Sequence, residues 1–395
     1  MTAPIDPPAA PRLDAAAAMR QQRGTRVPFG WDALRNPYLF DVPLLGYASG
    51  LLDLFVRAPR YLPSDTPVMG SFLSLDPPIF CCQPRPKPFG VAHHLASCFP
   101  DTPFVFLHPL THSLERAAFA LALAVQHRRF RSFHPAARLV VLANTPDEER
   151  LLHCLGVDVH LAPQNMFVDE TMYFPMPDRE RRYDAIYNAQ IAPIKRHALA
   201  RTVPTCAYVT KLFGTWSPRL KRTQLAAFLR SLPQGHAVLN PVTPDDVVPM
   251  DHVAVNAAMA EAHVGLCLSR IEGAMYASIE YLLAGVPVVT TRSKGGRDRF
   301  CHADTTLIVD DDPRAVQDGV AAMKARALPP EFVRATTLRM IEAERERFNS
   351  FIDGLRGHTI ERTDPRWSFD YYHKLGRFGR LSDFEGEFLT TKTTR

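Results

Sequence analysis

The chain has little of what marks a disulfide-rich or metal-stapled protein. Its seven cysteines are an odd number, and no two of them form a C-x-x-C pair. A disulfide framework or structural zinc site is therefore not expected, and a reducing compartment fits. No H-E-x-x-H motif occurs among the 15 histidines, so the sequence predicts no metal site of that kind.

Long apolar runs are missing as well. The longest clean run, residues 117–125, is far shorter than the roughly 20 residues that cross a bilayer as a helix. Residues 1–26 contain proline and alanine without the apolar core of a signal peptide, and we expect them to be a disordered lead-in. The expected location is cytoplasmic, with peripheral contact at the inner membrane face left open.

Charge of one sign is not in large excess. The formal net charge is +5, from 46 basic and 41 acidic residues, which is too mild to predict a nucleic-acid partner. The run from His127 to Arg131 is more basic. Such runs are usually solvated helix ends, and the alternative is a patch for an anionic acceptor or a membrane surface.

From residue 104 onward, short apolar segments alternate with helical ones. Strands are expected at residues 104–107, 139–142 and 157–161, with a helix over residues 114–129. Thr145 has the features of a helix N-cap, since Pro146 and three acids follow it. This order predicts a parallel sheet covered by helices. Before residue 110, frequent prolines predict loops rather than long helices.

A second alternating series follows a polar, proline-bearing stretch at residues 174–182, where we place a linker. Expected strands are residues 185–187, 206–209, 237–239, 264–268, 286–289 and 306–309, and expected helices include residues 220–232 and 274–283. In such a doubly wound domain, a ligand binds at the carboxyl ends of the strands.

These boundaries predict four parts. They are the lead-in, a first α/β domain over residues 27–178, a second α/β domain over residues 183–328, and a C-terminal part over residues 329–395. The last part contains a long amphipathic helix at residues 330–355 and an aromatic tail at residues 367–388. We expect it to pack back across both domains.

The most informative segment runs from Ser269 to Asp312. Glu272 follows an expected strand, and Glu280 lies eight residues later in the next helix. Eight residues are slightly more than two helical turns, so the two acids would share one side. Gly273 and Ala274 stand at the expected helix start, where free N–H groups and the macrodipole favour a phosphate.

A second glycine-rich turn, Gly295-Gly296, follows the next expected strand. Two such turns side by side predict a cradle for a diphosphate. Taken alone, each acid is most simply a solvated surface residue. An ordered set of two acids, a Gly-Val-Pro-Val-Val strand and a Gly-Gly turn is much less easily reached by chance. Asp310-Asp311-Asp312 is interpreted as a solvated turn.

This segment resembles the E-x7-E motif of retaining GT-B glycosyltransferases, especially glycosyltransferase family 4. The likeness is good over residues 264–323 and looser over residues 183–263. It implies an α/β fold of GT-B type, with two Rossmann-like doubly wound domains facing a cleft. The domain over residues 27–178 would be the acceptor-side domain, and the domain over residues 183–328 would bind the nucleotide sugar. The resemblance also implies that Glu272 contacts hydroxyls of a donor sugar and that Glu280 binds the ribose of the nucleotide.

The stretch after the first strand of the second series supports the resemblance. Lys195 matches the family lysine that neutralises the donor diphosphate, and a fixed cation there would stabilise the departing group. The sequence departs from the family at two positions. Gln190 stands where the family has an arginine, and Arg196 stands where it has a glycine, so Arg196 is a candidate for the missing cation.

The first domain is less like the family, because no Gly-Gly pair occurs before residue 295. That domain is predicted to be shortened or rewired. His108 ends an expected strand and is a candidate for orienting sugar hydroxyls, with a structural histidine as the plainer interpretation.

The resemblance predicts transfer of a sugar from a nucleoside diphosphate sugar to an unknown acceptor, with retention, and with no cofactor or metal. Two alternatives stay open. One is a GT-B-like protein that binds a nucleotide sugar without catalysis, and the other is a nucleotide-sugar epimerase.

Overall fold

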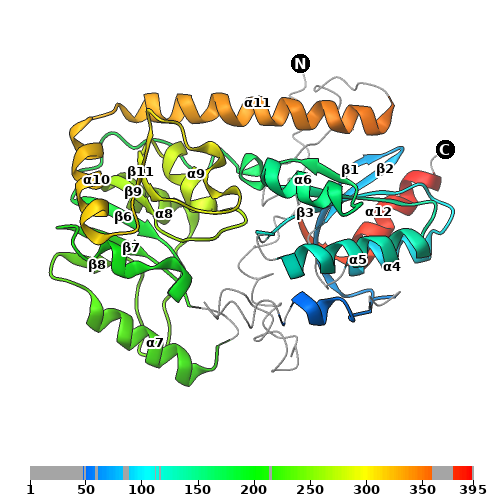
Figure 1. Cartoon of the computed structure of the whole chain (residues 1–395), viewed down its shortest axis with the longest axis horizontal. Coiled ribbons are helices and arrows are strands. Elements are labelled where there is room, and N and C mark those ends of the chain that lie inside the picture. The colour runs from blue at the N-terminus through cyan, green and yellow to red at the C-terminus, as the bar shows by residue number, and fades with distance from the viewer. Residues whose placement is uncertain are drawn as a thin grey trace, which may run out of the picture.

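Two six-stranded sheets organise the chain, one toward each end of the molecule (Figure 1). The computed structural model describes residues 48, 50–57, 61–82, 89–111, 113–114, 117–212, 216–357 and 377–393. The expected lead-in at residues 1–26 and the start of the aromatic tail, residues 367–376, lie outside these ranges. We call the part built on each sheet the first and the second domain.

The second sheet is wholly parallel, with the order β11-β10-β9-β6-β7-β8. The strands are β6 (Tyr183–Asn188), β7 (Cys206–Val209), β8 (His236–Val238), β9 (Ala262–Cys267), β10 (Val288–Thr291) and β11 (Thr306–Val309). All six expected strands are present. Strand order reverses between β6 and β9, which defines the switch point of a doubly wound sheet.

Capped helices connect these strands. They are α7 (Pro218–Ser231), α8 (His252–Ala260), α9 (Tyr276–Leu283) and α10 (Pro313–Ala325). Ser217, Asp251 and Asp312 each accept a backbone N–H bond at the start of a helix, which satisfies groups that have no partner within the helix.

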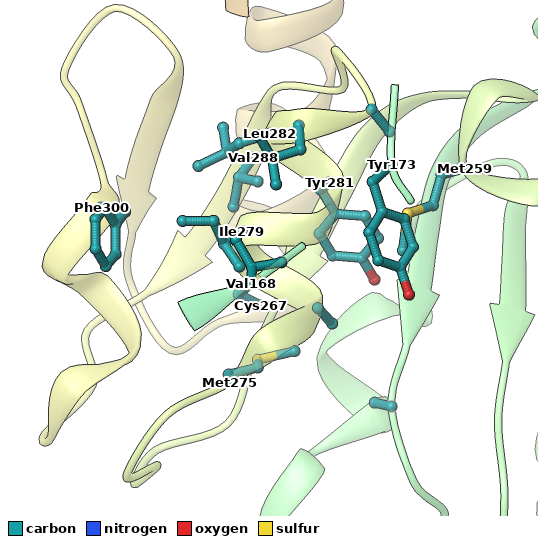
Figure 2. Close-up of a cluster of buried hydrophobic side chains, with 14 of the residues drawn as sticks. Val168, Tyr173, Met259, Cys267, Met275, Ile279, Tyr281, Leu282, Val288 and Phe300 are labelled. Carbon is teal, nitrogen blue, oxygen red and sulfur yellow. The ribbon is translucent and has the colours of Figure 1, made fainter. Parts of the chain in front are cut away.

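Helix α9 lies largely in the interior, with six of its eight residues buried. Figure 2 shows its residues Ile279, Tyr281 and Leu282 among Cys267 of β9 and Val288 of β10. The ring of Tyr281 lies against Gly265, where an added Cβ would come within 2.5 Å of it. The glycine therefore lets the helix pack directly onto the sheet.

The first sheet is mixed, with the order β12-β1-β2-β3-β4-β5. Its strands are β1 (Pro67–Leu75), β2 (Pro78–Cys82), β3 (Val105–Pro109), β4 (Arg138–Ala143), β5 (Val159–Leu161) and β12 (Arg377–Arg380). Only β1 runs against its neighbours. The helices are α4 (Gly90–Cys98), α5 (Ala117–Phe133) and α6 (Pro146–Cys154), and Thr145 caps α6 as expected.

The proline-rich region before residue 110 is more regular than predicted. It contains the β1–β2 hairpin and α4. Prolines stand at the first residue of β1 and of β2, positions that leave the strand interiors free of them. The expectation of loops there was therefore wrong for residues 67–82 and 90–98.

The C-terminal part connects the two domains. Helix α11 (Pro330–Arg356) runs along the molecule from the second domain to the first (Figure 1). Strand β12 then pairs with β1, and α12 (Leu381–Thr393) buries Leu381, Phe384 and Phe388 in the core of the first domain. The end of the described chain thus completes the first sheet.

Two arginines of α11 fasten the segment that joins the domains. Arg345 forms hydrogen bonds of 2.9 and 2.8 Å with the Glu170 carboxylate and donates to the carbonyls of Met166 and Val168. Arg334 donates to the carbonyls of Glu170 and Tyr173. The α/β class with two parallel-sheet domains is confirmed. Within the described ranges, no helix is both long and apolar enough to span a bilayer.

Candidate functional site

A buried ion pair bridges the switch point of the second sheet. The ammonium of Lys195 donates a hydrogen bond to Oε1 of Glu272, and the two side chains are only 14% and 7% exposed. Lys195 ends the short helix η2 (Pro193–Lys195) after β6, and Glu272 lies five residues after β9. Because β6 and β9 are neighbours, the pair lies where ligands of doubly wound sheets bind.

The backbone around Lys195 is held from the sheet side. The hydroxyl of Tyr187 donates to the carbonyl of Lys195 at 2.5 Å. The imidazole of His197 packs against Tyr187, Tyr208 and Phe228. Its burial, and then the nearby Lys195 charge, lower the pKa of His197 to about 4. His197 is therefore neutral near pH 7, and the positive charges of residues 195–197 are those of Lys195 and Arg196.

Arg196 has a left-handed backbone conformation, which glycine adopts more readily than any other residue. Its φ of 49° and ψ of 44° are left-handed, a conformation that costs a non-glycine residue roughly 1–2 kcal/mol. Its guanidinium donates to the Leu268 carbonyl, the Thr291 hydroxyl and the Asp311 carboxylate at 2.6, 2.7 and 2.6 Å. These bonds fasten three strand ends together and use the charge within the protein.

The Asp310–Asp312 turn is exposed, as expected, and two of its acids also have partners in the protein. Asp311 pairs with Arg196, which is the largest reason that the pKa of Asp311 lies below its ordinary value. Asp312 caps α10. Both acids serve the second sheet and its helices.

The loop that carries Glu272 is fastened to the Gly-Gly turn. The backbone N–H of Glu272 donates to the Lys294 carbonyl at 3.1 Å, and that of Gly296 to the Gly273 carbonyl at 2.8 Å. Gly295 has a φ of +92°, and an added Cβ would lie 1.9 Å from the Glu272 carbonyl oxygen. Only glycine fits at position 295, because any side chain would collide with the backbone of Glu272. The predicted diphosphate cradle is not needed to explain these glycines.

The helix after Glu272 starts later than predicted. Helix α9 begins at Tyr276 with Met275 as N-cap, so Gly273 and Ala274 lie in the preceding loop. Glu272 and Glu280 therefore do not share one helical face, since only Glu280 is on the helix. Glu280 is partly exposed in the second turn of α9, and its charge acts on Lys211 and Tyr276.

Residues of the first domain meet these loops directly. An added Cβ at Gly296 would lie 2.5 Å from the Cβ of Asn144. The Asn165 amide donates to the Met275 carbonyl at 3.2 Å, and the Tyr276 hydroxyl donates to the Gln164 carbonyl at 3.0 Å. The site loops thus lie against the ends of β4 and of the segment after β5.

Glu148 holds this first-domain surface in place. Its carboxylate accepts the backbone N–H groups of Leu114 and Asn144 at 3.1 and 3.0 Å. Burial raises the pKa of Glu148, while these bonds oppose the rise. The sequence marked it only as an acid in the first turn of a helix.

Arg297 is a supporting residue that the sequence did not reveal. Its side chain is fully buried. Its guanidinium donates to the carbonyls of Ser269 and Thr291 and pairs with Asp298 at 2.7 Å. It therefore joins the ends of β9 and β10 beneath the Glu272 loop. In the sequence it is one arginine among several after Gly-Gly, without a spacing that would indicate burial.

The remaining candidates, His108 and Gln190, have surroundings of their own. His108 is 5% exposed in β3 and packs edge-to-face on Phe89, with ring centres 4.6 Å apart. This packing suits a structural histidine, and its role toward a sugar stays a prediction. Gln190 is partly exposed, two residues after β6. The roles of Lys195, Glu272, Glu280 and the glycines also remain predictions.

One cluster in the first domain has the residue types of a metal site. Ligand atoms of His94, Cys98 and Glu385 lie within 4.8 Å of one another. However, the backbone N–H of Leu62 donates to Nδ1 of His94 at 2.9 Å, so Nε2 carries the proton and donates to Glu385 at 2.7 Å. A metal on Nε2 would require either an imidazolate or a proton on Nδ1, and the proton would break the bond from Leu62. The cluster is better explained as a hydrogen-bonded link between α4 and α12.

Comparison with known proteins agrees with this architecture. Residues 223–325 match the family described as Glycosyl transferases group 1. This match includes α9, Glu272, Glu280 and the Gly-Gly turn, but not Lys195. No curated protein sequence matches the chain.

Several solved structures are similar to the chain at low identity. Sucrose-phosphate synthase from Thermosynechococcus elongatus is 15% identical over 68% of this chain and 72% of that one, with a TM-score of 0.50. The HepE protein of Anabaena, in complex with UDP and glucose, is 12% identical over 67% and 75%, with a TM-score of 0.49. A glycosyltransferase from Rickettsia africae is 12% identical over 69% and 76%, with a TM-score of 0.45. The likeness to sucrose-phosphate synthase supports a shared two-domain α/β fold, and the family match is confined to residues 223–325 of the second domain.

Proposed function

We propose that this protein transfers a sugar from a nucleoside diphosphate sugar to an acceptor, with retention at the anomeric carbon. The observation that carries the proposal is the Lys195–Glu272 ion pair at the switch point of a doubly wound sheet. It stands beside a segment that matches a glycosyltransferase family. Retention is inferred from the resemblance of the E-x7-E segment.

Each residue of the pair has a distinct proposed task. When the bond from the sugar C1 to the diphosphate breaks, negative charge builds on the leaving group, and the ammonium of Lys195 stabilises it. That ammonium has three donors, so it can hold Glu272 and a phosphate oxygen together. Glu272 would accept hydroxyls of the donor sugar, and Glu280 would accept those of the ribose.

The reaction is proposed to need no metal. Glu272 pairs with Lys195 and the nearby Asp311 pairs with Arg196, so each acid has a cation from the loop after β6 as its partner. Positioning and the fixed ammonium would supply the stabilisation instead. Turnover that survives EDTA at undiminished rate would agree with this; turnover that vanishes and returns with a divalent ion would contradict it.

The test begins with a thermal-shift screen of nucleoside diphosphates and nucleotide sugars, since a ligand of the folded state raises the melting temperature. Hits are then incubated without and with candidate acceptors, and the anomeric signals are followed by NMR. A new glycosidic signal of the donor's configuration supports the proposal. An inverted product would contradict retention, free-donor interconversion would indicate an epimerase, and binding without any bond cleavage would indicate a non-catalytic protein.

Glu280→Ala sharpens the test of the donor site. Loss of two charge-assisted bonds to the ribose should weaken donor binding about 100-fold, with the fold intact. Glu346→Ala, an exposed acid on α11, is the matched control and should bind as the wild type does. Normal donor affinity in Glu280→Ala would remove the ribose assignment.

We also propose that the first domain touches an anionic membrane surface. Leu51, Leu52 and Phe55 are 49%, 45% and 77% exposed. Gln126 of α5 fastens their segment by donating to the carbonyls of Asp53 and Val56 at 2.7 and 3.1 Å.

One arginine of the basic run contacts this apolar segment, since Arg129 donates to the Val56 carbonyl at 3.1 Å. In the basic run, His127 and Phe130 are buried, whereas Arg128 and Arg131 are exposed on α5. Apolar side chains beside arginines suit the interface of an anionic bilayer. Sedimentation with phosphatidylglycerol vesicles should recover the protein, and Phe55→Ser should reduce recovery while Val253→Ser, an exposed apolar residue of α8, should not. Equal recovery with neutral vesicles would contradict the charge component.

A further inference from the structure

Positive charge at the proposed diphosphate position is incomplete if Lys195 acts alone. Gln190 is neutral where the resembling family has an arginine. Arg196 is committed to Leu268, Thr291 and the Asp311 carboxylate. Lys195 already shares its ammonium with Glu272. A diphosphate brings more than one negative charge, so another cation is expected along this edge of the sheet.

Lys211 lies at the same edge, two residues beyond β7. Its carbonyl accepts the backbone N–H of Ile191 at 3.0 Å. The hydroxyl of the preceding Thr210 donates to the Ala189 carbonyl at 2.7 Å. These two bonds flank Gln190 on both sides, so the backbone of Lys211 lies beside the position that lacks the family charge.

The backbone at Lys211 is also fixed from its other side. The N–H of Thr210 donates to Oδ1 of Asn240 at 2.6 Å, and the amide of Asn240 donates to the Val248 carbonyl at 3.0 Å. Thr210 and Asn240 are both buried. The Lys211 side chain therefore starts from a rigid point on the sheet, as a preorganised binding group requires.

The charges around Lys211 are those of the proposed donor site. Desolvation by the surrounding protein has the largest effect on the pKa of the Lys211 ammonium and lowers it. The Glu280 carboxylate of α9 raises this pKa, and the Lys195 charge lowers it. The side chain keeps an exposed surface. Among the residues that the structure describes, no carboxylate forms a salt bridge with it. Two ammonium groups thus share one edge of the sheet, and an anion between them would relieve their repulsion.

We infer that Lys211 is a second cation for the diphosphate of the donor, contributed by the end of β7 in place of the charge absent at Gln190. This inference rests on the proposed function and adds a binding residue to it. It accounts for how a chain without the family arginine holds a doubly charged group. Glu280 would then lie between the ribose and the Lys211 ammonium.

The experiment compares affinities for nucleosides, monophosphates and diphosphates. Calorimetry with UDP, GDP and ADP identifies the base that the wild type prefers. The same titrations are repeated with Lys211→Ala, Lys211→Arg and the control Lys324→Ala. Lys324 lies on α10 and pairs with Asp184 of β6. Lys211→Ala should lose about 10- to 100-fold in affinity for the diphosphate and much less for the nucleoside. Lys211→Arg should keep most of the affinity, and Lys324→Ala should keep all of it.

The outcomes separate this inference from the function beneath it. If the wild type binds a diphosphate and Lys211→Ala binds it equally well, Lys211 is not a phosphate residue, while the proposed function stands. An equal loss for nucleoside and diphosphate would also overturn the inference, because it would indicate a change of shape. If the wild type binds none of the diphosphates, both the proposed function and this inference fail.

Discussion

The two sheets of this protein are assembled from the sequence in different ways. The second sheet takes its six strands from one continuous stretch, residues 183–309, and all run parallel. The first takes five strands from residues 67–161 and the sixth from residues 377–380. The second sheet carries the candidate site at its switch point, whereas the first provides a surface that meets it. The candidate site therefore lies on a sheet whose strands are near one another in the sequence. The first sheet, in contrast, is completed only by a strand that is distant in the sequence.

The largest effect is expected from removing residues 377–393. This deletion takes away β12 and the buried side chains of Leu381, Phe384 and Phe388. Burial of such side chains contributes roughly 1.5–3 kcal/mol each, which is a large share of a typical stability of about 5–15 kcal/mol. We expect hydrogen exchange to show loss of protection in β1 to β4 while β6, β9 and β10 stay protected. Equal loss in both sheets would mean that they are not separate in stability.

Lys195→Ala should have the next largest effect, and on turnover rather than on the fold. Loss of one preorganised charge at a developing negative charge typically costs about 10²–10³ in rate. The buried Glu272 would lose its partner, which costs roughly 1–3 kcal/mol of stability. The matched control is Lys324→Ala, whose partly exposed pair with Asp184 is worth less than about 1 kcal/mol. Turnover retained in Lys195→Ala would move the phosphate site elsewhere.

Gly295→Ala separates support of the Glu272 loop from backbone strain. Gly295 and Gly156 both have positive φ, at +92° and +75°, but only Gly295 has protein where a Cβ would go. Gly156→Ala should lose about 1 kcal/mol because of its positive φ. Gly295→Ala should lose more, about 1–3 kcal/mol from the backbone alone, because its φ of 92° and ψ of −171° lie in a region that is nearly exclusive to glycine. Only Gly295→Ala should also displace Glu272, and a misplacement of about 1 Å can cost about 100-fold in rate. Equal turnover in the two variants would show that the turn does not position Glu272.

The effect that is smallest near neutral pH concerns the acid stability of the second domain. The pKa of His197 is about 4 in the folded protein against 6.5 ordinarily, so below about pH 6.5 the unfolded chain binds more protons. The free energy of unfolding should therefore fall as pH drops from 6.5 toward 4, by up to about 3 kcal/mol. His197→Asn, which keeps a donor for the Ala189 carbonyl, should flatten urea-denaturation stability across this range. An unchanged slope would exclude His197 as the cause.

The fold could be predicted from sequence where its contacts are local. Alternation of apolar strands with helices gave every strand of the second sheet, and Thr145 gave the start of α6. The β1–β2 hairpin was missed because proline density was interpreted as loop, although the prolines begin the strands. Strand β12 could not be found by any local pattern, because its partner lies about three hundred residues earlier.

The candidate site was predictable in composition but not in geometry. Spacing and resemblance identified Lys195 and Glu272, yet nothing in the spacing shows that they form an ion pair. The helix start was misplaced by two residues because Ala274 and Met275 are ordinary helix formers, and the N-cap at Met275 has no side-chain bond. Arg297 and Lys211 were missed because burial and neighbouring charge are properties of the packed chain.

The position of β12 in the chain also sets an order of events during synthesis. Residues 183–309 leave the ribosome before residues 377–393, so the second domain has all of its strands while β1 still presents a bare edge. Exposed edges recruit strands from other chains. Each newly made molecule therefore passes through an interval in which it is open to such pairing, and that interval ends only when its own last strand arrives.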